Sequence, residues 1–214
     1  MSSLEQRDLF AESGILSAYD GSASLSQGGT LSYAAVSGPG EPRLSTKDRL
    51  YDQTVVDIYY RTHERDFASK NLGTFSECLK SGLIPTDYPR TGTALYLQQG
   101  EDDGSYSATS LNAGMLALMD SGIALQFLTA AVNIAYNSES GSFILDPDKL
   151  ESQNAQALIL FVFESRSRQM ISSSLQKGKV SLKVFNKALK MAREASASIF
   201  DFYRKAVEKK FSKD

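Results

Sequence analysis

The least polar part of the chain, residues 93–125, predicts a strand, a loop, a buried helix and a second strand. Alternating apolar residues indicate the first strand over Thr93 to Gln99. After residue 107, leucine and methionine recur at helical spacing while alanine and glycine keep the other side small. This pattern is typical of a helix packed on more than one face. We expect Ser107 or Thr109 to cap its start and Gly122 to end it.

The loop between this strand and this helix, residues 101–107, is acidic and contains Gly104. A loop that leads into a helix N-terminus directs backbone N–H groups outward and can bind an anion. Three carboxylates in the loop repel phosphate, however, and no Lys or Arg lies between Arg90 and Lys149. An anion site and a simple strand-to-helix turn therefore both remain open, and the charges favour the turn.

The first part of the chain has the short alternating runs and glycine turns of an antiparallel β-meander. Its expected strands are Ile15–Tyr19, Ser22–Ser26 and Thr30–Val36, and the prolines of Gly38–Pro42 should break it. Residues 1–13 are polar, which favours an N-terminal arm or a short helix, and residues 43–52 are expected to form a surface loop.

The remaining elements follow from the same two periodicities. We expect strands over Gln53–Arg61, Ile123–Tyr136, Phe143–Asp146, Ala155–Phe163 and Gln169–Leu175, and a helix between His63 and Leu83. A long C-terminal helix starts at the cap Ser181, with one apolar stripe made of Leu182, Phe185, Leu189, Ala192, Ile199, Phe202 and Ala206. The order predicts an α+β protein: an arm over residues 1–13 and a single domain over residues 14–214, in which helices pack on a mixed sheet.

Composition adds few constraints. With 214 residues, of which 42% are hydrophobic and 22% charged, the chain can bury a sizeable core. The single cysteine, Cys78, excludes an internal disulfide and is expected to be a small packing residue. No apolar run approaches the roughly 20 residues that span a bilayer, and the N-terminus lacks the features of a secretory signal. We therefore expect an intracellular protein without a membrane partner.

Charge is distributed unevenly along the chain. Residues 177–214 hold eleven Lys and Arg against four Asp and Glu, a net charge of +7, whereas the preceding residues hold twelve against twenty-one, a net charge of −9. A basic C-terminal helix fits RNA, an acidic protein neighbour, or simply a solvated helix face.

The search for catalytic motifs yields little. The sequence has no phosphate-binding P-loop, no dinucleotide fingerprint and no nucleophile elbow. His63 is the only histidine, which excludes histidine-rich metal sites, and its charged neighbours indicate an exposed strand end. Asp146, Asp148 and Glu151 lie close enough in sequence to hold magnesium, but we favour Asp-Pro-Asp-Lys-Leu-Glu as an ordinary helix start, where acidic residues suit the dipole.

Several segments resemble the RNase PH-like family. Gly14–Leu16, Asp20–Ala23, Gly29–Thr30 and Val36–Pro42 are similar to its opening pattern, and Ser110–Ile123 looks like its helix ending in A-L-x-D-A-G-I. The resemblance implies an RNase PH-like fold. Within the family, the sequence is most similar to a ring subunit of the fungal RNA exosome.

That resemblance implies partners and a location. The partners would be other RNase PH-like ring subunits, RNA-binding cap subunits, an associated hydrolytic exoribonuclease, and RNA threaded through the ring for 3′-to-5′ processing and decay, including rRNA maturation. The expected locations are the nucleus, the nucleolus and the cytoplasm.

The family's catalytic residues are absent at the matching positions. Tyr106 stands where active members carry a phosphate-binding arginine, and Ser152 and Leu158 stand where they carry two aspartates. Because phosphoryl transfer depends on positioning and electrostatic stabilisation, we expect no enzyme activity, catalytic residue, metal or cofactor. The resemblance leaves Lys80, Ser105 and Tyr106 as candidate RNA contacts.

Two other functions remain open. One is an active phosphorolytic or hydrolytic 3′-to-5′ exoribonuclease, whose site would have to use residues such as Asp146 and Asp148. The other is a stand-alone RNA-binding module that holds RNA on the Lys183 to Lys210 face of the last helix.

Overall fold

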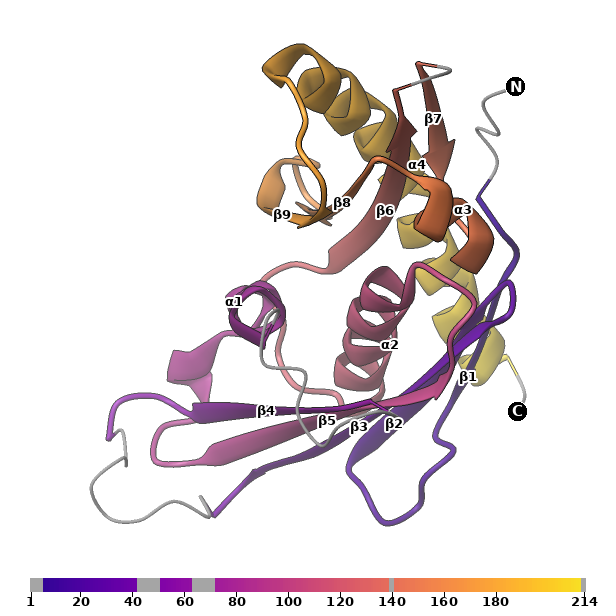
Figure 1. Ribbon diagram of the computed structural model, residues 1–214. Helices are drawn as coiled ribbons and strands as arrows, with labels where there is room; N and C mark the ends of the chain where they lie inside the picture. Colours follow the sequence, from indigo (N-terminus) through magenta and orange to yellow (C-terminus); the bar gives the residue numbers. More distant parts are fainter. Residues whose placement is uncertain (1–5, 42–50, 63–71, 139–140, 213–214) are drawn as a thin grey trace.

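The computed structural model describes residues 6–41, 51–62, 72–138 and 141–212 (Figure 1). Its strands are β1 (Leu9–Ser13), β2 (Gly21–Gln27), β3 (Thr30–Gly40), β4 (Val55–Arg61), β5 (Gly92–Glu101), β6 (Thr129–Asn137), β7 (Ser142–Leu145), β8 (Ala157–Glu164) and β9 (Met170–Lys177). Its helices are α1 (Leu72–Gly82), α2 (Tyr106–Asp120), α3 (Lys149–Asn154) and α4 (Leu182–Phe211), with a short 3-10 turn at Pro85–Asp87.

The strands form two sheets where the sequence predicted one. The first has the order β1-β2-β3-β5-β4 and is mixed, because β4 runs parallel to β5. The second has the order β7-β6-β8-β9 and is antiparallel throughout. Helices α1 and α2 lie between the two sheets, and α4 runs past both layers and contacts β1, β6 and β8 (Figure 1). The α+β class and the long C-terminal helix are confirmed.

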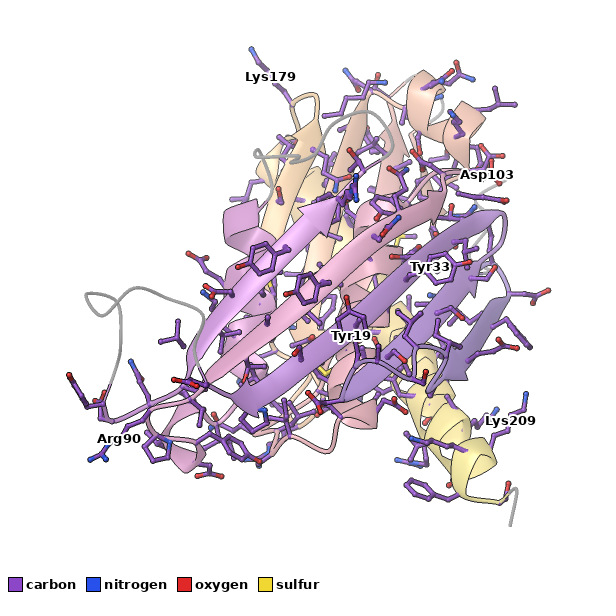
Figure 2. All side chains as sticks on the ribbon, turned by 90° about the horizontal axis from the view of Figure 1, so that it is seen from below. Tyr19, Tyr33, Arg90, Asp103, Lys179 and Lys209 are labelled. Atoms are coloured by element: carbon purple, nitrogen blue, oxygen red, sulfur yellow. The ribbon has the colours of Figure 1, made fainter. Side chains whose placement is uncertain are left out.

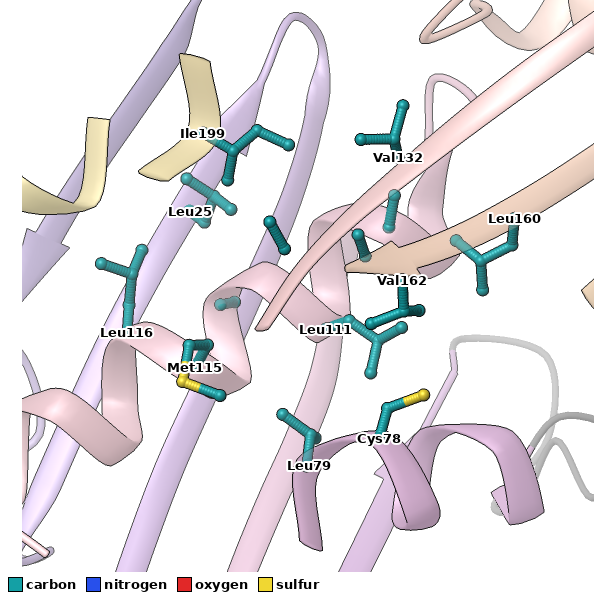
Figure 3. Packing of buried hydrophobic residues seen from close by; sticks show 14 of the residues in the cluster. Leu25, Cys78, Leu79, Leu111, Met115, Leu116, Val132, Leu160, Val162 and Ile199 are labelled. Atoms are coloured by element: carbon teal, nitrogen blue, oxygen red, sulfur yellow. The ribbon is translucent and has the colours of Figure 1, made fainter. Parts of the chain in front are cut away.

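Helix α2 is buried on every side because it separates the two sheets. Residues 108–118 are all buried, which confirms the prediction of packing on more than one face. Gly114 shows why small residues are needed, since an added Cβ would lie 3.1 Å from Leu97 Cδ2 and 3.3 Å from Leu79 Cδ1. Figure 3 shows α2 packed between α1 and the strands of the second sheet. Cys78 is fully buried in this core, and burial raises the pKa of its thiol to about 11.

One polar group sits at the centre of this core. The Asn112 side chain donates from Nδ2 to the Ala131 carbonyl oxygen at 3.0 Å, and its Oδ1 accepts from the Ala131 N–H at 2.8 Å. The Tyr203 hydroxyl of α4 donates to the same Oδ1 at 2.9 Å. β7 pairs with β6 only from Ile134 onwards. The Asn112 amide therefore provides hydrogen-bond partners for the N–H and carbonyl groups of Ala131, in a part of β6 that β7 does not reach.

The N-terminal meander exists, but its first strand was predicted in the wrong place. β1 pairs antiparallel with β2, so residues 9–13 are a sheet strand and not an arm or a short helix. The predicted strand Ile15–Tyr19 is a loop, closed where the Leu16 N–H donates to Ser22 Oγ at 2.9 Å. Leu16 and Tyr19 are each 40% exposed, so their apolar character does not report a core position.

The predicted break at Gly38–Pro42 occurs later than expected. β3 continues to Gly40, which pairs with Gly92 across an irregularity in the ladder, and the Gly38–Pro39 peptide is cis. The Gly38 N–H leaves the ladder and donates to Asp20 Oδ2 at 2.7 Å. Proline therefore interrupts strand pairing without ending the strand.

Helix α4 begins as predicted, because Ser181 Oγ accepts from the Val184 N–H at 3.4 Å. The predicted stripe faces the core except at its first residue, because Ala192 and Ile199 are fully buried and Phe185, Leu189, Phe202 and Ala206 pack against the core. Leu182 is 74% exposed, whereas Tyr203 is 1% exposed and lies in the core. The residues of α4 that are fully buried are Ala188, Ala192, Ser196, Ile199 and Tyr203.

The other predicted elements have mixed outcomes. The predicted strands at β4, β5, β7, β8 and β9 are confirmed, as is the helix at α1 from Leu72 onwards. β6 starts only at Thr129, because residues 123–128 form a connection without strand structure except for one bridge. The predictions for His63 and for residues 43–50 lie outside the described residues.

Candidate functional site

The acidic loop between β5 and α2 has an unusual backbone. Gly104 and Ser105 have φ angles of +87° and +53°, so the chain turns sharply before the helix. Ser105 is the N-cap, not Ser107 or Thr109 as predicted, and its side chain makes no capping hydrogen bond. Its hydroxyl instead donates to the Pro147 carbonyl oxygen at 2.9 Å. The loop is therefore fixed to the segment that joins β7 to α3.

Gly104 is required by that close packing. A Cβ at this position would lie 2.4 Å from the Asp148 carbonyl carbon and 2.5 Å from the Pro147 carbonyl oxygen. Both atoms belong to the backbone and cannot move aside as a flexible side chain would. Asp148 is itself fixed, because it forms a capping box with Glu151 at the start of α3. The helix start predicted from Asp-Pro-Asp-Lys-Leu-Glu is confirmed.

Arg7 joins the same two loops from the N-terminal side. Its Nε and Nη2 donate to the two carboxylate oxygens of Asp146 at 2.8 and 2.9 Å, which is a bidentate ion pair. Nη1 also donates to the Asp103 carbonyl oxygen at 3.0 Å. Burial lowers the pKa of Arg7, but the hydrogen bond and charge of Asp146 outweigh it, so the pKa is raised. Asp146 is 3% exposed, so its charge is neutralised within the protein.

A cleft of about 450 Å³ opens where α2 begins, facing α3 and the ends of β8 and β9. Its lining residues are Asp102, Gly104, Ser105, Tyr106, Ser107, Asn133, Lys149, Ser152, Gln153, Leu158, Gln176 and Lys177. Ser105, Tyr106, Ser152 and Leu158, which the family resemblance singled out from separate parts of the sequence, therefore meet in one place. Lys80 is exposed on α1 and does not line the cleft.

Tyr106 borders the cleft, but its hydroxyl points inward. The hydroxyl oxygen is buried and has no hydrogen-bond partner among the described residues. The ring centroid lies 5.7 Å from that of Tyr60. Burial, more than any neighbour, raises the pKa of the Tyr106 hydroxyl, so the side chain stays neutral and offers the cleft only part of its ring.

Two further polar groups of the cleft lack partners within the described part of the chain. These are Asn133 Oδ1, on a residue only 4% exposed, and the buried Nε2 of Gln176. Lys149 and Lys177 supply the positive charge of the cleft. The Nζ of Lys177 donates to the Gln153 carbonyl oxygen at 2.7 Å, so this cation is held at the last turn of α3. The cleft is thus lined by amides, hydroxyls and two lysines.

This arrangement offers binding groups and little acid–base chemistry. Asp102 is the one carboxylate among the lining residues. Asp146 and Asp148, which do not line the cleft, are held by Arg7 and by the α3 cap. Among the residues that the structure describes, no three His, Cys, Asp or Glu side chains gather as a metal site.

Sequence reasoning missed Arg7, Asn133, Gln176 and Lys177. For Arg7, a signal that could have been used is the unbalanced negative charge of the acidic loop, which requires a cation from elsewhere in the chain. Gln176 and Lys177 lie on a strand with few apolar residues, where no local pattern marks a site.

In the described chain, no helix is both long enough and apolar enough to cross a membrane.

Comparisons with known proteins place this geometry in context. Residues 5–124 match the family described as "3' exoribonuclease family, domain 1". The Arabidopsis thaliana protein named exosome complex exonuclease RRP46 homolog is 27% identical, over 97% of this chain and 93% of its own. The exosome complex component Rrp41 of Pyrobaculum arsenaticum is also 27% identical, over 97% of this chain and 87% of its own. The crystal structure of rice (Oryza sativa) Rrp46 is 26% identical with a TM-score of 0.89, over 97% and 98% of the two chains.

Proposed function

This chain belongs to the 3′ exoribonuclease family, and we propose that it is an RNase PH-like ring subunit of an RNA exosome that does not itself degrade RNA. The family resemblance predicted from the sequence is confirmed. Similarity to the RRP46 homologue of Arabidopsis extends over nearly all of both chains, which supports a role as a whole ring subunit. The archaeal Rrp41 protein has the same sequence identity to this chain as the Arabidopsis protein. Overall identity therefore does not separate a catalytic from a non-catalytic subunit, and the residues of the cleft must do so.

The composition of the cleft carries the proposal. The three positions that the family resemblance assigns to a phosphate-binding arginine and two aspartates lie together and hold Tyr106, Ser152 and Leu158. A neutral tyrosine whose hydroxyl is buried cannot stabilise an attacking phosphate as a guanidinium does. A leucine can neither donate a proton nor bind a metal. The loss removes the electrostatic stabilisation on which phosphorolysis depends.

An active exoribonuclease built from other residues is less consistent with the structure. That alternative needs Asp146 and Asp148, and both carboxylates already have structural partners. Asp146 forms a bidentate pair with Arg7, and the Asp148 side chain accepts from the Glu151 N–H at 2.6 Å. Using either residue for catalysis would dismantle the packing of the acidic loop or the start of α3.

We expect the purified chain, incubated with single-stranded RNA, inorganic phosphate and magnesium, to release no nucleoside diphosphates. The physical reason is that Tyr106 replaces the arginine expected to hold the phosphate, and Ser152 and Leu158 replace the acid pair. Chromatography of the products measures the outcome, with a phosphorolytic 3′ exoribonuclease assayed in parallel as the positive control. Release of nucleoside diphosphates or monophosphates in proportion to the amount of chain would overturn the proposal.

The net positive charge of α4 favours a stand-alone RNA-binding module, but the contacts of its lysines support that function less well. Several cations of α4 are used within the chain: Lys210 pairs with Asp120 at 2.6 Å, Lys209 lies over the Phe10 ring, and Lys187 lies over the Phe143 ring. These contacts remove part of the positive face that RNA phosphates would need. Part of the positive charge of α4 is therefore used in contacts within the protein.

As a ring subunit, the chain would act with other RNase PH-like subunits, RNA-binding cap subunits and a hydrolytic exoribonuclease that degrades the threaded RNA. Its role would be scaffold and channel wall in RNA processing, decay and surveillance. The corresponding locations are the nucleus, the nucleolus and the cytoplasm. Residues 14–214, together with the strand β1, would form the one domain that enters the ring.

The proposed RNA contacts are Lys80, Ser105 and Tyr106. Tyr106 would contribute the exposed part of its ring by stacking on a base. Ser105 would contribute through its backbone, because its hydroxyl is bound to Pro147. Lys80, exposed on α1, would contact a phosphate outside the cleft.

In an assembled ring, Tyr106→Ala and Lys80→Ala together should reduce photocrosslinking of threaded RNA to this subunit by roughly fivefold, the scale of one lost stacking contact. Lys179→Ala, an exposed lysine before α4, is the matched control and should leave crosslinking unchanged. Equal crosslinking of both variants would contradict the contact assignment while leaving the non-catalytic role intact.

A further inference from the structure

The outer face of the five-stranded sheet carries an exposed group of tyrosines. The face that points away from α2 presents Tyr33 from β3, Tyr96 from β5 and Tyr59 from β4, and Tyr19 reaches it from the preceding loop (Figure 2). We call these four residues the tyrosine patch. Tyr19, Tyr33 and Tyr59 are 40%, 38% and 41% exposed, which is unusual for such large side chains gathered on one face.

Three of the four tyrosines, Tyr19, Tyr59 and Tyr96, are held in place by contacts between their rings. Tyr59 stacks on Tyr96 with centroids 5.1 Å apart and ring planes 13° from parallel. Tyr19 meets Tyr96 edge-on at 5.7 Å. Strand pairing fixes the backbones beneath, because Tyr59 and Tyr96 are register partners. Aromatic side chains fixed in this way lose little entropy on binding, which makes them effective anchors of an interface.

Carboxylates border the tyrosine patch at one end. A cleft of about 400 Å³ is lined by Tyr59 together with Asp20, Glu41 and Asp57, and by residues 37–40 and 92–94. Asp57 lies two residues before Tyr59 on the same face of β4. Arg61, two residues after Tyr59, is the cation on this face of the strand. The face is therefore aromatic in its middle and acidic where the cleft lies.

A ligand that contacts both the aromatic rings and the carboxylates is best matched by a guanidinium group. Arginine stacks on aromatic faces and forms bidentate hydrogen bonds with carboxylates, whereas the ammonium group of lysine does neither as well. Single-stranded RNA also stacks on exposed aromatics, but three carboxylates at the edge of the patch repel its phosphates. The complementary ligand is therefore a protein segment that carries arginine.

We propose that the tyrosine patch and its acidic cleft bind an extended, arginine-bearing segment of a partner protein. One arginine enters the cleft towards Asp57 while the neighbouring part of the segment lies on Tyr59 and Tyr96. This inference goes beyond the proposed function, because the patch lies on the outer face of the first sheet and shares no residue with the cleft at α2. Either proposal can fail without the other.

The test uses the full-length chain and a fluorescein-labelled peptide of four Arg-Gly repeats, with binding followed by fluorescence anisotropy. The matched probes are a Lys-Gly peptide of equal length and an eight-nucleotide oligoadenylate. We expect the arginine peptide to bind about tenfold more tightly than the lysine peptide, because only arginine combines stacking with the bidentate pair. We expect the oligoadenylate to bind more weakly than both peptides.

Two variants connect binding to the patch. Asp57→Asn and Tyr59→Ser should each weaken binding of the arginine peptide about fivefold, the scale of one cation–π or ion-pair contact. Asp201→Asn on α4 and Tyr51→Ser are the matched controls and should bind as the parent does. Because Asp57→Asn is a conservative surface change, it remains informative if Tyr59→Ser loses structure. Equal binding of both peptides, tighter binding of oligoadenylate, or parent-like binding by Asp57→Asn would overturn the proposal.

Discussion

An Asn112→Ala variant is expected to lose about 4 kcal/mol of its free energy of unfolding, from two unsatisfied backbone groups and one lost side-chain hydrogen bond. The amide of Asn112 makes both hydrogen bonds of Ala131, whose N–H and C=O face the side of β6 that β7 does not reach. Removing the amide leaves both groups buried beside α2 without partners, since the site is closed to water. Urea unfolding monitored by circular dichroism measures the loss.

Tyr203→Phe is the control that separates the network from the packing. This change removes only the hydroxyl, which donates to Asn112 Oδ1 at 2.9 Å and also lies 3.2 Å from the Thr129 carbonyl oxygen, and it leaves both bonds to Ala131 in place. We expect a loss of about 1 kcal/mol, the usual contribution of one hydrogen bond. If Asn112→Ala lowers the free energy of unfolding by no more than Tyr203→Phe does, the two hydrogen bonds between Asn112 and Ala131 are not the source of the stability assigned to them.

Arg7→Met should lower the free energy of unfolding by about 3 kcal/mol, because it leaves the buried Asp146 carboxylate without its partner. We take the lower end of the usual range since 20% of the Arg7 side chain is exposed. The change also removes the hydrogen bond that Arg7 donates to the Asp103 carbonyl oxygen. The acidic loop should then separate from the β7–α3 connection, which amide hydrogen exchange would detect as faster exchange at the start of α2.

A double-mutant cycle tests whether the ion pair is responsible. Combining Arg7→Met with Asp146→Asn should cost clearly less than the sum of the two single changes, because no unpaired charge then remains buried. Lys210→Met is the matched control: it breaks an ion pair with Asp120 whose lysine is 44% exposed, and should cost no more than about 1 kcal/mol. Additive costs for Arg7 and Asp146 would show that the two side chains stabilise the fold independently.

Elements whose apolar pattern reflects their own burial were predictable. β5 and β8 alternate or run apolar because they face the core, and α2 is apolar on all sides because it lies between two sheets. The predicted strand Ile15–Tyr19 failed for the opposite reason, since Leu16 and Tyr19 are apolar residues on the surface. β1 was missed because an edge strand of five half-exposed residues has little periodicity to detect.

In the candidate site too, some residues could be predicted from the sequence and others could not. Ser105, Tyr106, Ser152 and Leu158 were identified because each lies in a segment similar to a family motif, and the fold brings those segments together. Arg7 could not be found in this way, because its partner Asp146 lies 139 residues away and only the tertiary fold brings the two together. The burial of Tyr203, which the predicted α4 stripe did not include, has a related cause: its hydroxyl donates to Asn112 of α2, and no property of α4 alone indicates that contact.

Helix α4 follows in sequence the elements on which it packs, which affects how the protein is made. Ala188, Ala192, Ile199 and Tyr203 complete a core whose other walls, α2 and β6, are synthesised long before them. While the ribosome is still extending the chain, those walls expose apolar surface. Contacts this distant in sequence also form slowly. The newly made chain therefore buries this apolar surface only once α4 has been synthesised, and a chaperone that binds exposed apolar surface would act before that point.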